Sequence, residues 1–248
     1  RTIQKRVTKK MKRILLMVLY NLPFAPFWWF QLCSMAAHPE RYSQEKRWAV
    51  LQKVTRSANK GGRVTIESHG IQNIPEKENF IFYPNHQGLF DVLAMIESCP
   101  RFFAVVNKKE VTNIPLLKQV FHIMGAYAID REDIRQSMGV INRVAEDVKN
   151  GKNFLIFAEG TRSKQGNKPQ EFKGGSFKSA YKAKCPIVPV ALMNAFIPFD
   201  GNTIEKVTVK VIYLEPIPYE EYKDMKTVEI AAEVKRRIEE AIAVHTAE

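Results

Sequence analysis

His86 and Asp91 stand five residues apart, directly after an apolar run, and this pair is the part of the sequence best suited to chemistry. On a regular helix their side chains would point about 140° apart, so the backbone must bend between them if they are to meet. Gly88 permits such a bend, and Pro84 ends the strand predicted for 79–83. A carboxylate that accepts a hydrogen bond from one imidazole nitrogen fixes the tautomer and leaves the other nitrogen free as a general base.

No Ser or Cys stands in an obvious nucleophile elbow near the pair, so the base would take its proton from a substrate hydroxyl. A simpler interpretation is also open: Asp91 N-caps a helix over 92–98, and His86 is an ordinary histidine of a turn. A histidine and an aspartate at this spacing recur by chance. The choice between the two interpretations depends on the residues that accompany the pair.

The charge of the chain narrows the class of partner. The 248 residues contain 38 Lys and Arg against 26 Asp and Glu, which gives a net charge of +12 and a length that suits one large domain with an appendage. Such a charge favours an anionic partner, and nucleic acid, anionic lipid and a phosphorylated substrate all qualify. The chain has no nucleic-acid recognition motif of the usual kinds, and Trp28 and Trp29 lie in an apolar segment, which argues against nucleic acid.

The cysteines give no sign of a metal or of disulfides. Cys33, Cys99 and Cys185 have neither paired nor metal-ligand spacing. We therefore expect reduced thiols in a cytosolic compartment. Proton abstraction by His86 calls for no metal either.

The first 37 residues have the composition of a membrane-associated segment. Residues 1–13 contain seven basic and no acidic side chains, and residues 14–37 contain no charged residue. A single helix over 14–37 would measure about 36 Å, enough to span a bilayer core. Pro23 and Pro26 should break it into two short helices, and basic residues also follow it, from Arg41 to Lys60, so both flanks prefer the cytosolic side. We expect an interfacial two-helix hairpin on an anionic membrane surface, with a single crossing and a cleaved signal peptide as the alternatives.

The rest of the chain alternates strand and helix patterns. Gly61 and Gly62 follow a basic amphipathic helix, so we divide the chain into an amino-terminal membrane-association motif, 1–60, and a catalytic domain, 61–248. Apolar residues recur with helical spacing from Ile134 to Val148 and from Ile230 to Ile242. Strand-like runs cover 63–68, 79–83, 101–106, 127–129, 153–157, 187–193 and 207–214. The alternation predicts an α/β fold, a central β-sheet flanked by helices.

A second group of candidate residues follows the apolar strand at 153–158. Glu159, Gly160, Thr161 and Arg162 come directly after it, where the loops of α/β sheets form binding sites. Gly160 lets the backbone approach a ligand, Thr161 offers a hydroxyl, and the guanidinium of Arg162 matches the geometry of phosphate oxygens. Glu159 either holds Arg162 or accepts a hydrogen bond from a substrate hydroxyl. The run predicts a phosphate site.

Two further cations follow strand ends or glycine turns. Lys173 precedes Gly174 and Gly175, which open a predicted helix whose N-terminal amides favour an anion, and Arg131 follows the strand at 127–129. Together with Arg162 they predict convergence on one anionic group. Taken singly, each is equally well explained as a solvated loop charge.

Four blocks of the sequence, in this order, resemble the 1-acylglycerol-3-phosphate acyltransferase family. The similarity extends from about residue 63 to residue 214, and the order and spacing of the blocks make it more specific than any one of them. Ala128 and Ala158 stand where the family often has Phe and Pro, which loosens any inference about the shape of an acyl pocket. The blocks are Asn85 and His86 to Asp91, Gly125 to Arg131, Glu159 to Arg162, and the proline-containing strand from Cys185 to Val190.

The resemblance implies transfer of a fatty acyl group from an acyl thioester to the sn-2 hydroxyl of lysophosphatidic acid, giving phosphatidic acid for phospholipid biosynthesis. It implies His86 as the general base and Asp91 as the residue that orients it. No metal or cofactor is implied, because the acyl carrier protein or coenzyme A thioester is a co-substrate. Arg162, with Gly160, Thr161 and Lys108, would hold the phosphate, and Arg131 would either bind phosphate or support the site.

The resemblance also implies a mixed sheet flanked by helices. Some bacterial members have an amino-terminal two-helix membrane motif, and the proline-broken hairpin here is similar to it. We therefore expect the protein at the cytoplasmic face of the cell membrane, the inner membrane in a bacterium.

Other functions fit the same residues. Glycerol 3-phosphate or another lysophospholipid is an alternative acceptor, because the same His and Asp serve relatives with different acceptors. Outside the enzymes, the alternative is a non-catalytic lipid-binding module whose basic charge serves adhesion to anionic membrane. The combination of His86, Asp91 and Arg162 favours the enzyme.

Overall fold

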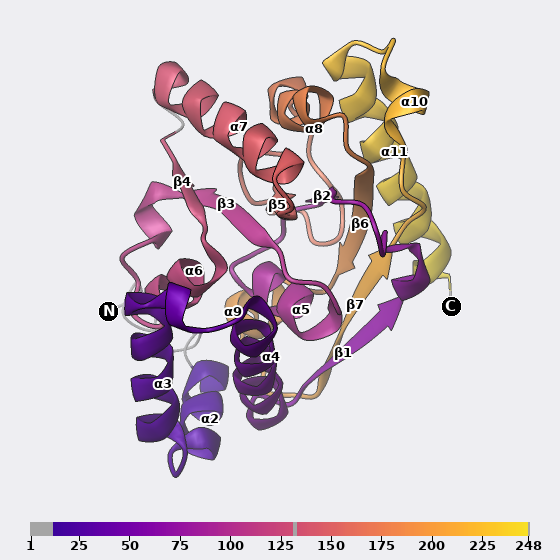
Figure 1. Cartoon of the computed structure of the whole chain (residues 1–248). Helices are drawn as coiled ribbons and strands as arrows, with labels where there is room; N and C mark the ends of the chain where they lie inside the picture. Colours follow the sequence, from indigo (N-terminus) through magenta and orange to yellow (C-terminus); the bar gives the residue numbers. More distant parts are fainter. Residues whose placement is uncertain (1–11, 131–132, 248) are drawn as a thin grey trace.

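A seven-stranded sheet lies at the centre of the computed structural model, which describes residues 12–130 and 133–247 (Figure 1). The strands follow the order β1-β7-β6-β2-β5-β3-β4. All seven strands occur where the sequence pattern predicted them, with ends that differ by up to three residues. Their bounds are β1 Val64–His69, β2 Ile81–Pro84, β3 Ala104–Lys108, β4 Tyr127–Ile129, β5 Phe154–Ile156, β6 Ile187–Met193 and β7 Val207–Tyr213.

The sheet is mixed, as predicted. Strand β6 runs antiparallel to β7, and every other neighbouring pair is parallel. Strands β2, β5 and β3 lie side by side, so their carboxyl ends reach the same edge of the sheet. Because both faces of these strands are covered, their sequences are mostly apolar, and β2 is buried along its whole length. This edge carries the loops that hold the candidate site residues.

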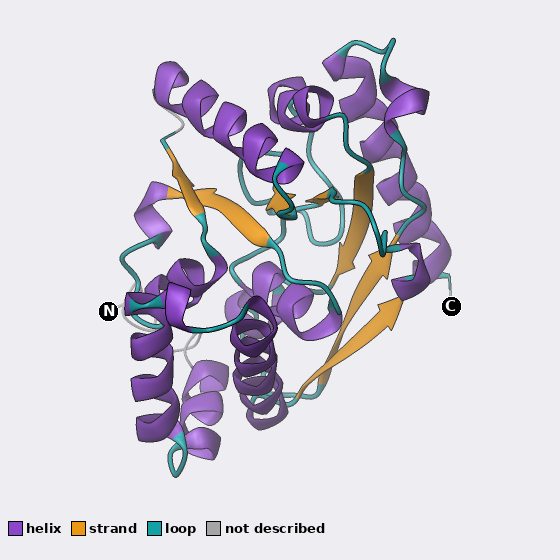
Figure 2. Ribbon diagram, viewed as in Figure 1, coloured by secondary structure: helices purple, strands orange, loops and turns teal. Residues whose placement is uncertain are grey.

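Helices cover both faces of the sheet (Figure 2). Helices α4 Gln44–Gly61, α5 Phe90–Ser98 and α6 Leu117–Met124 contribute to one apolar core. Helices α7 Ile134–Lys149, α8 Lys178–Ala183 and α11 Thr227–Thr246 contribute to a second core on the other face. Two short helices, α9 Ile197–Asp200 and α10 Tyr219–Tyr222, lie in the connections on either side of β7. The predicted α/β class with flanking helices is confirmed.

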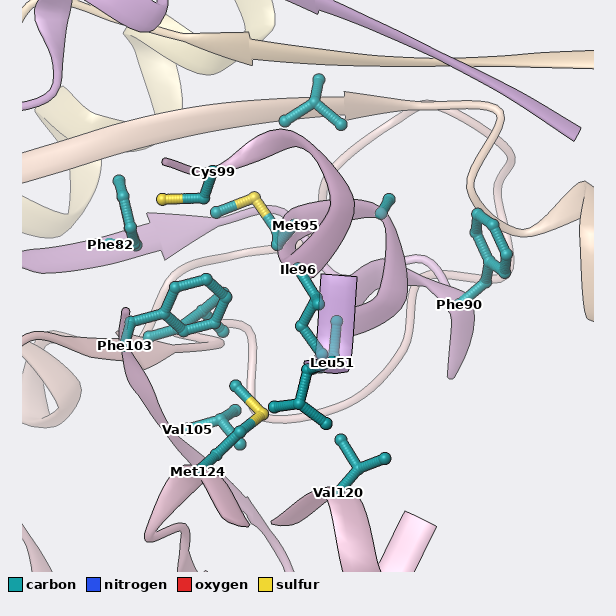
Figure 3. Close-up of a cluster of buried hydrophobic side chains, with 14 of the residues drawn as sticks. Leu51, Phe82, Phe90, Met95, Ile96, Cys99, Phe103, Val105, Val120 and Met124 are labelled. Atoms are coloured by element: carbon teal, nitrogen blue, oxygen red, sulfur yellow. The ribbon is translucent and has the colours of Figure 1, made fainter. Parts of the chain in front are cut away.

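The first core supports the edge where the site forms (Figure 3). Phe82 of β2 and Phe103, just before β3, meet edge to face with ring centroids 5.6 Å apart. Leu51 of α4 and Met95 of α5 belong to the same buried cluster. Burial of such side chains stabilises the fold by about 1.5–3 kcal/mol each, so the strand ends rest on a rigid base.

The apolar face predicted for α7 is only partly buried. Ile141, Ala145 and Val148 are buried as expected, but Ile134 in the first turn is 77% exposed. Asp133 caps this end, because its carboxylate accepts hydrogen bonds from the backbone amides of Arg135 and Gln136. The first turn of α7 therefore presents an apolar side chain to solvent.

The amino-terminal segment forms a bent pair of helices, as Pro23 and Pro26 predicted. Helices α2 Lys12–Asn21 and α3 Ala25–Ala37 meet at an angle of 96°. Within the described residues no single helix is both long and apolar enough to cross a membrane, although the bent pair together meets the length and composition criteria. Nine large apolar side chains of this pair are exposed, namely Leu15, Val18, Leu19, Tyr20, Leu22, Phe24, Phe27, Trp29 and Phe30.

Helix α2 is fastened to the end of α4. Arg13 is 2% exposed, and its guanidinium donates hydrogen bonds to the carbonyl oxygens of Gly62, Thr203 and Glu205. Ser57 of α4 donates to the side-chain oxygen of Asn21 at 2.6 Å. These bonds fix the direction of the hairpin relative to the sheet. The predicted division at residues 60 and 61 falls at the end of α4, and a separate 1–60 unit stays a prediction.

Candidate active site

The imidazole of His86 and the carboxylate of Asp91 meet in the structure. Nδ1 of His86 lies 2.7 Å from Oδ2 of Asp91. The Asp91 side chain is fully buried, and that of His86 is 15% exposed. A carboxylate at this distance holds the ring proton on Nδ1, so Nε2 is the nitrogen left to accept a proton. The pair therefore has the arrangement that a general base requires.

Asp91 also makes the bend that brings the two side chains together. Its Oδ2 accepts a hydrogen bond from the backbone amide of Gln87 at 2.7 Å, and both of its oxygens accept from the amide of Gly88 at 3.0 Å. Helix α5 begins at Phe90, so Asp91 lies inside its first turn, and the amides that it binds precede the helix. The simpler interpretation, in which Asp91 only caps a helix over 92–98, does not describe this geometry.

Three contacts from the next loop fix His86 in place. Its backbone amide donates to Oε1 of Glu159 at 2.7 Å, and its carbonyl oxygen accepts from the amide of Ser163 at 2.7 Å. Its ring stacks on that of Phe157, with centroids 3.9 Å apart and planes at 24°. The loops after β2 and β5 are thereby joined, which restricts rotation of the imidazole.

Glu159 supports the site by binding the backbone of two loops. It is 3% exposed, and its second oxygen accepts a hydrogen bond from the backbone amide of Gln170 at 3.0 Å. Burial raises the pKa of Glu159, and the hydrogen bonds from the amides of His86 and Gln170 oppose that rise. Both oxygens thus bind loop backbone rather than Arg162, with which the sequence suggested a pairing.

A buried network of side-chain amides lies beside the His86 loop. Gln87 is 2% exposed, and its Nε2 donates to Oδ1 of Asn167 at 3.0 Å and to the carbonyl of Leu192 at 2.9 Å. Its oxygen accepts from the amide of Ala195 at 2.7 Å. Asn85 exchanges two hydrogen bonds with the backbone of Leu192. The end of β6 and the loop after β5 are therefore tied to the same turn, and fully satisfied networks of this kind make a site rigid.

His86 lines a cavity of about 720 Å³. Thr161, Arg162 and Lys108 line the same cavity. Nη1 of Arg162 lies 3.9 Å from Oδ2 of Asp200, and the side chain of Arg162 is 45% exposed. Nζ of Lys108 lies 2.7 Å from a carboxylate oxygen of Glu110, and the Lys108 side chain is 47% exposed. Lys164, which is exposed, also lines the cavity. The cavity thus combines a histidine base with three accessible cations.

Apolar side chains line much of the remaining cavity wall. They come from the start of α5, from β3 and the segment that follows it, from α6, and from the loops that follow β5 and β6. This wall suits a hydrocarbon chain, whereas the loops carrying His86 and Arg162 are polar. Its apolar members are Leu89, Val92, Val105, Val106, Val111, Phe121, Phe157 and Phe196.

Other predicted site residues do not line the cavity. Glu159, Gly160 and Lys173 are not among its lining residues, and Gly160 has φ of +75°, a conformation that favours glycine. A Cβ atom on Gly160 would lie 3.0 Å from Nζ of Lys173, so the group that approaches this glycine is that lysine. Arg131 lies outside the described residues. The cavity wall therefore brings together His86, Lys108, Thr161 and Arg162, and Asp91 joins them through its contact with His86.

The cavity also contains residues that the sequence did not single out. Phe157 supports the imidazole, and Asp200 lies beside Arg162. Asn107 is 8% exposed, and neither atom of its side-chain amide has a hydrogen-bond partner among the described residues. Such a group costs about 1–3 kcal/mol when it stays unsatisfied. A polar residue directly after the apolar run 102–106 was the only sequence signal for Asn107.

Comparisons with known proteins agree with this site. A family model described as acyltransferase matches residues 65–193. The chain is similar to the 1-acyl-sn-glycerol-3-phosphate acyltransferase of Borreliella burgdorferi, with 33% identity over 60% of this chain and 59% of that protein. The enzyme of that name from Salmonella typhimurium is 30% identical over 66% of this chain and 67% of its own length. A chloroplastic relative from Brassica napus is 32% identical, but the match spans only 36% of its length.

The fold has a solved counterpart. The crystal structure of the 1-acyl-sn-glycerophosphate (LPA) acyltransferase PlsC from Thermotoga maritima superposes with a TM-score of 0.73 and 23% sequence identity. The superposition covers 95% of this chain and 98% of that one, which shows a shared fold. The match to the acyltransferase model covers more than half of the sequence. The chain therefore belongs to the acyltransferase family that contains the 1-acyl-sn-glycerol-3-phosphate acyltransferases.

Proposed function

We propose that this protein transfers a fatty acyl group from an acyl thioester to the sn-2 hydroxyl of lysophosphatidic acid, giving phosphatidic acid. The observation that carries the proposal is the 2.7 Å contact between His86 and buried Asp91, in a cavity that Arg162 and Lys108 also line. A histidine base beside accessible cations suits a substrate that has both a hydroxyl and a phosphate. The names of the relatives support the same substrate class.

In the proposed mechanism His86 and Asp91 act as one unit. Nε2 of His86 takes the proton of the sn-2 hydroxyl as its oxygen attacks the thioester carbonyl carbon. Asp91 stabilises the imidazolium that forms and keeps the ring in position. As the tetrahedral intermediate collapses, the carbon–sulfur bond breaks and the proton passes from His86 to the leaving thiolate. An ester and a free thiol result, and His86 returns to its neutral state.

Arg162 and Lys108 hold the phosphate of the acceptor in this proposal. Both line the cavity, and each has a carboxylate neighbour: Asp200 for Arg162 and Glu110 for Lys108. A bound phosphate would either displace this carboxylate from the cation or bind the cation beside it. Thr161 adds a hydroxyl at the same wall. Gly160 and Lys173 act indirectly, by shaping the loop that presents Arg162. The role of Arg131 in phosphate binding stays a prediction.

The bent helix pair serves as a membrane anchor in this proposal, on the cytoplasmic face of the membrane. Its exposed aromatic and aliphatic side chains would enter the headgroup region of one leaflet, next to a strongly basic amino-terminal sequence. The proposed acceptor is a membrane lipid, so an enzyme fixed at the surface of the bilayer meets it where it is concentrated, and the donor reaches the same site from the aqueous side. The acyl donor is a thioester of acyl carrier protein or coenzyme A.

Incubation of the purified protein with each thioester donor and a panel of acceptors tests the proposal. The panel contains lysophosphatidic acid, glycerol 3-phosphate and a lysophospholipid with a choline headgroup, and the lipid products are identified by mass spectrometry. We expect phosphatidic acid as the main product. His86→Ala should lose at least about 10²-fold in kcat, whereas His122→Ala, an exposed histidine of α6, should retain activity.

Each other outcome has a definite meaning. If only another acceptor gives a product, that acceptor and not lysophosphatidic acid is the substrate. Absence of transfer with every pair would favour the lipid-binding module. Full activity of His86→Ala would remove the histidine from the role of base.

A further inference from the structure

Asn107, the next-to-last residue of β3, lines the same cavity as His86. Its side chain is more than nine-tenths buried, and neither Nδ2 nor Oδ1 has a hydrogen-bond partner among the described residues. Buried amides are nearly always hydrogen-bonded in folded proteins, because the water that they lose must be replaced. Both amide atoms are closed to solvent in this conformation, so a ligand in the cavity can supply the partner only when the amide turns about its side-chain torsions.

The sheet places Asn107 close to the catalytic pair. Val106 pairs with Ile156 in the register of β3 and β5, so Asn107 lies next to Phe157, the residue whose ring supports the imidazole of His86. Strand β5 separates β3 from β2, so Asn107 and the strand that leads to His86 are two strand spacings, about 10 Å, apart. That separation leaves room for a reacting group between them.

Asn107 also lies at a change in the character of the cavity wall. Side chains two residues apart on a strand share a face, so Asn107 follows Val105 on the side of the first apolar core (Figure 3). The next residue along the chain is Lys108, one of the three cations that line the cavity. The cavity wall on the Val105 side of Asn107 therefore favours a hydrocarbon chain, and the wall on the Lys108 side favours a phosphorylated group.

The group that joins a hydrocarbon chain to a polar head in an acyl lipid or acyl thioester is a carbonyl. A carbonyl oxygen accepts a hydrogen bond, and Nδ2 of an asparagine donates one. The terminal torsion of asparagine is broad, so the amide can turn toward a ligand without a change in the backbone. The polarity and the position of the Asn107 side chain therefore both suit a carbonyl group as its ligand.

We infer that Asn107 is a substrate-binding residue whose side-chain amide donates a hydrogen bond from Nδ2 to the carbonyl oxygen of an acyl group in the cavity. The inference rests on the proposed function, in which two substrates carry such a carbonyl. If the ester of the acceptor is the partner, the bond contributes to acceptor binding. If the thioester of the donor is the partner, the bond strengthens as its oxygen gains negative charge during attack, and it contributes to kcat.

Paired ligands with and without the carbonyl test the inference. For the acceptor, dissociation constants of 1-octanoyl and 1-O-octyl glycerol 3-phosphate are measured by calorimetry. For the donor, a ketone analogue and a thioether analogue of the thioester, on whichever carrier the wild type accepts, are compared as inhibitors. Both pairs are measured for the wild type, for Asn107→Leu, which keeps the branched shape and removes the amide, and for Asn142→Leu, the same change at an exposed position of α7.

We expect the wild type and Asn142→Leu to prefer the carbonyl ligand of one pair by about 3- to 10-fold, and Asn107→Leu to lose that preference. If Asn107→Leu loses the preference in the acceptor pair, the partner of Asn107 is the ester carbonyl of the acceptor. If it loses the preference in the donor pair, the partner is the thioester carbonyl, and the kcat of Asn107→Leu should then be lower by about 10²-fold. Unchanged preferences in Asn107→Leu for both pairs would overturn the inference. If that variant does not fold, Asn107→Ala is read in its place.

The proposed function can fail separately. A wild type that transfers no acyl group to lysophosphatidic acid refutes the proposed function, whereas the binding preferences are measured without turnover. A wild type that transfers the group and an Asn107→Leu variant with unaltered preferences refute only the role of Asn107.

Discussion

The ring of His86 stacks on the ring of Phe157, with centroids 3.9 Å apart and planes at 24°. With the carboxylate of Asp91 on Nδ1, this contact leaves the imidazole little freedom to rotate. Phe157 and His86 follow neighbouring parallel strands, β5 and β2, so the stacking is a consequence of the sheet order.

Phe157→Leu should lower kcat by about 3- to 10-fold and leave the KM of the acceptor nearly unchanged. An aromatic stack contributes about 0.5–1.5 kcal/mol beyond its buried area, and here that energy restrains the base. Steady-state kinetics measure both constants. Phe157→Tyr should restore kcat because it restores the stack, and Tyr219→Leu, which alters an aromatic contact far along the chain, serves as the control. An equal loss in Phe157→Tyr would contradict a role for stacking.

Arg162→Lys should raise the KM of the phosphorylated acceptor by about tenfold with a small change in kcat. A lysine replaces the planar two-point contact of the guanidinium by a single ammonium. The measurement is the acceptor dependence of the initial rate. A KM equal to that of the wild type would exclude Arg162 from the phosphate site.

Asp200→Asn should have the opposite effect and lower the KM of the phosphorylated acceptor, by up to about fivefold at low salt. Oδ2 of Asp200 lies 3.9 Å from Nη1 of Arg162, so its charge repels a phosphate that binds the same guanidinium. The difference between Asp200→Asn and the wild type should shrink as salt rises, because the charges are partly exposed. A difference that is independent of salt would point to a change of shape instead of charge.

Stability should depend on pH through Glu159, because burial raises the pKa of this carboxyl in the folded protein. Between the ordinary glutamate pKa of about 4.3 and the raised value, the folded state binds more protons than the unfolded state, so the free energy of unfolding falls as pH increases. Above the raised value the fall ends. In Glu159→Gln this part of the pH dependence should be absent. Urea unfolding of both proteins from pH 4 upward measures it, and identical slopes would be the contrary result.

Aspartates on the hairpin should release the protein from membranes. Phe27 and Phe30 of α3 are 66% and 74% exposed, and the double change to Asp should reduce the fraction bound to anionic vesicles by at least about tenfold. Co-sedimentation with vesicles measures binding. Val244→Asp, an exposed site on α11, is the control and should bind as the wild type does. Undiminished binding of the double variant would assign membrane association to another surface.

Much of this architecture could be predicted because it depends on local patterns. The central strands are largely apolar runs, and the break between α2 and α3 follows from Pro23 and Pro26. The face of α7 was less predictable: Ile134 fits the helical period but is exposed. Periodicity in the sequence identifies the apolar face of a helix. How much of that face is buried depends on the surface that packs against it.

The sequence by itself determined the chemical inventory of this protein: an imidazole with a carboxylate five residues away, a guanidinium after an apolar strand, and an apolar amino-terminal hairpin. Only the tertiary structure decided which groups meet. Glu159 lies 73 residues from His86 and binds its backbone, Gln87 binds the backbone of Ala195 across 108 residues, and Asp200 and Asn107 face the same cavity. Such contacts depend on the order of strands in the sheet, and neither the spacing nor the composition of a chain specifies that order.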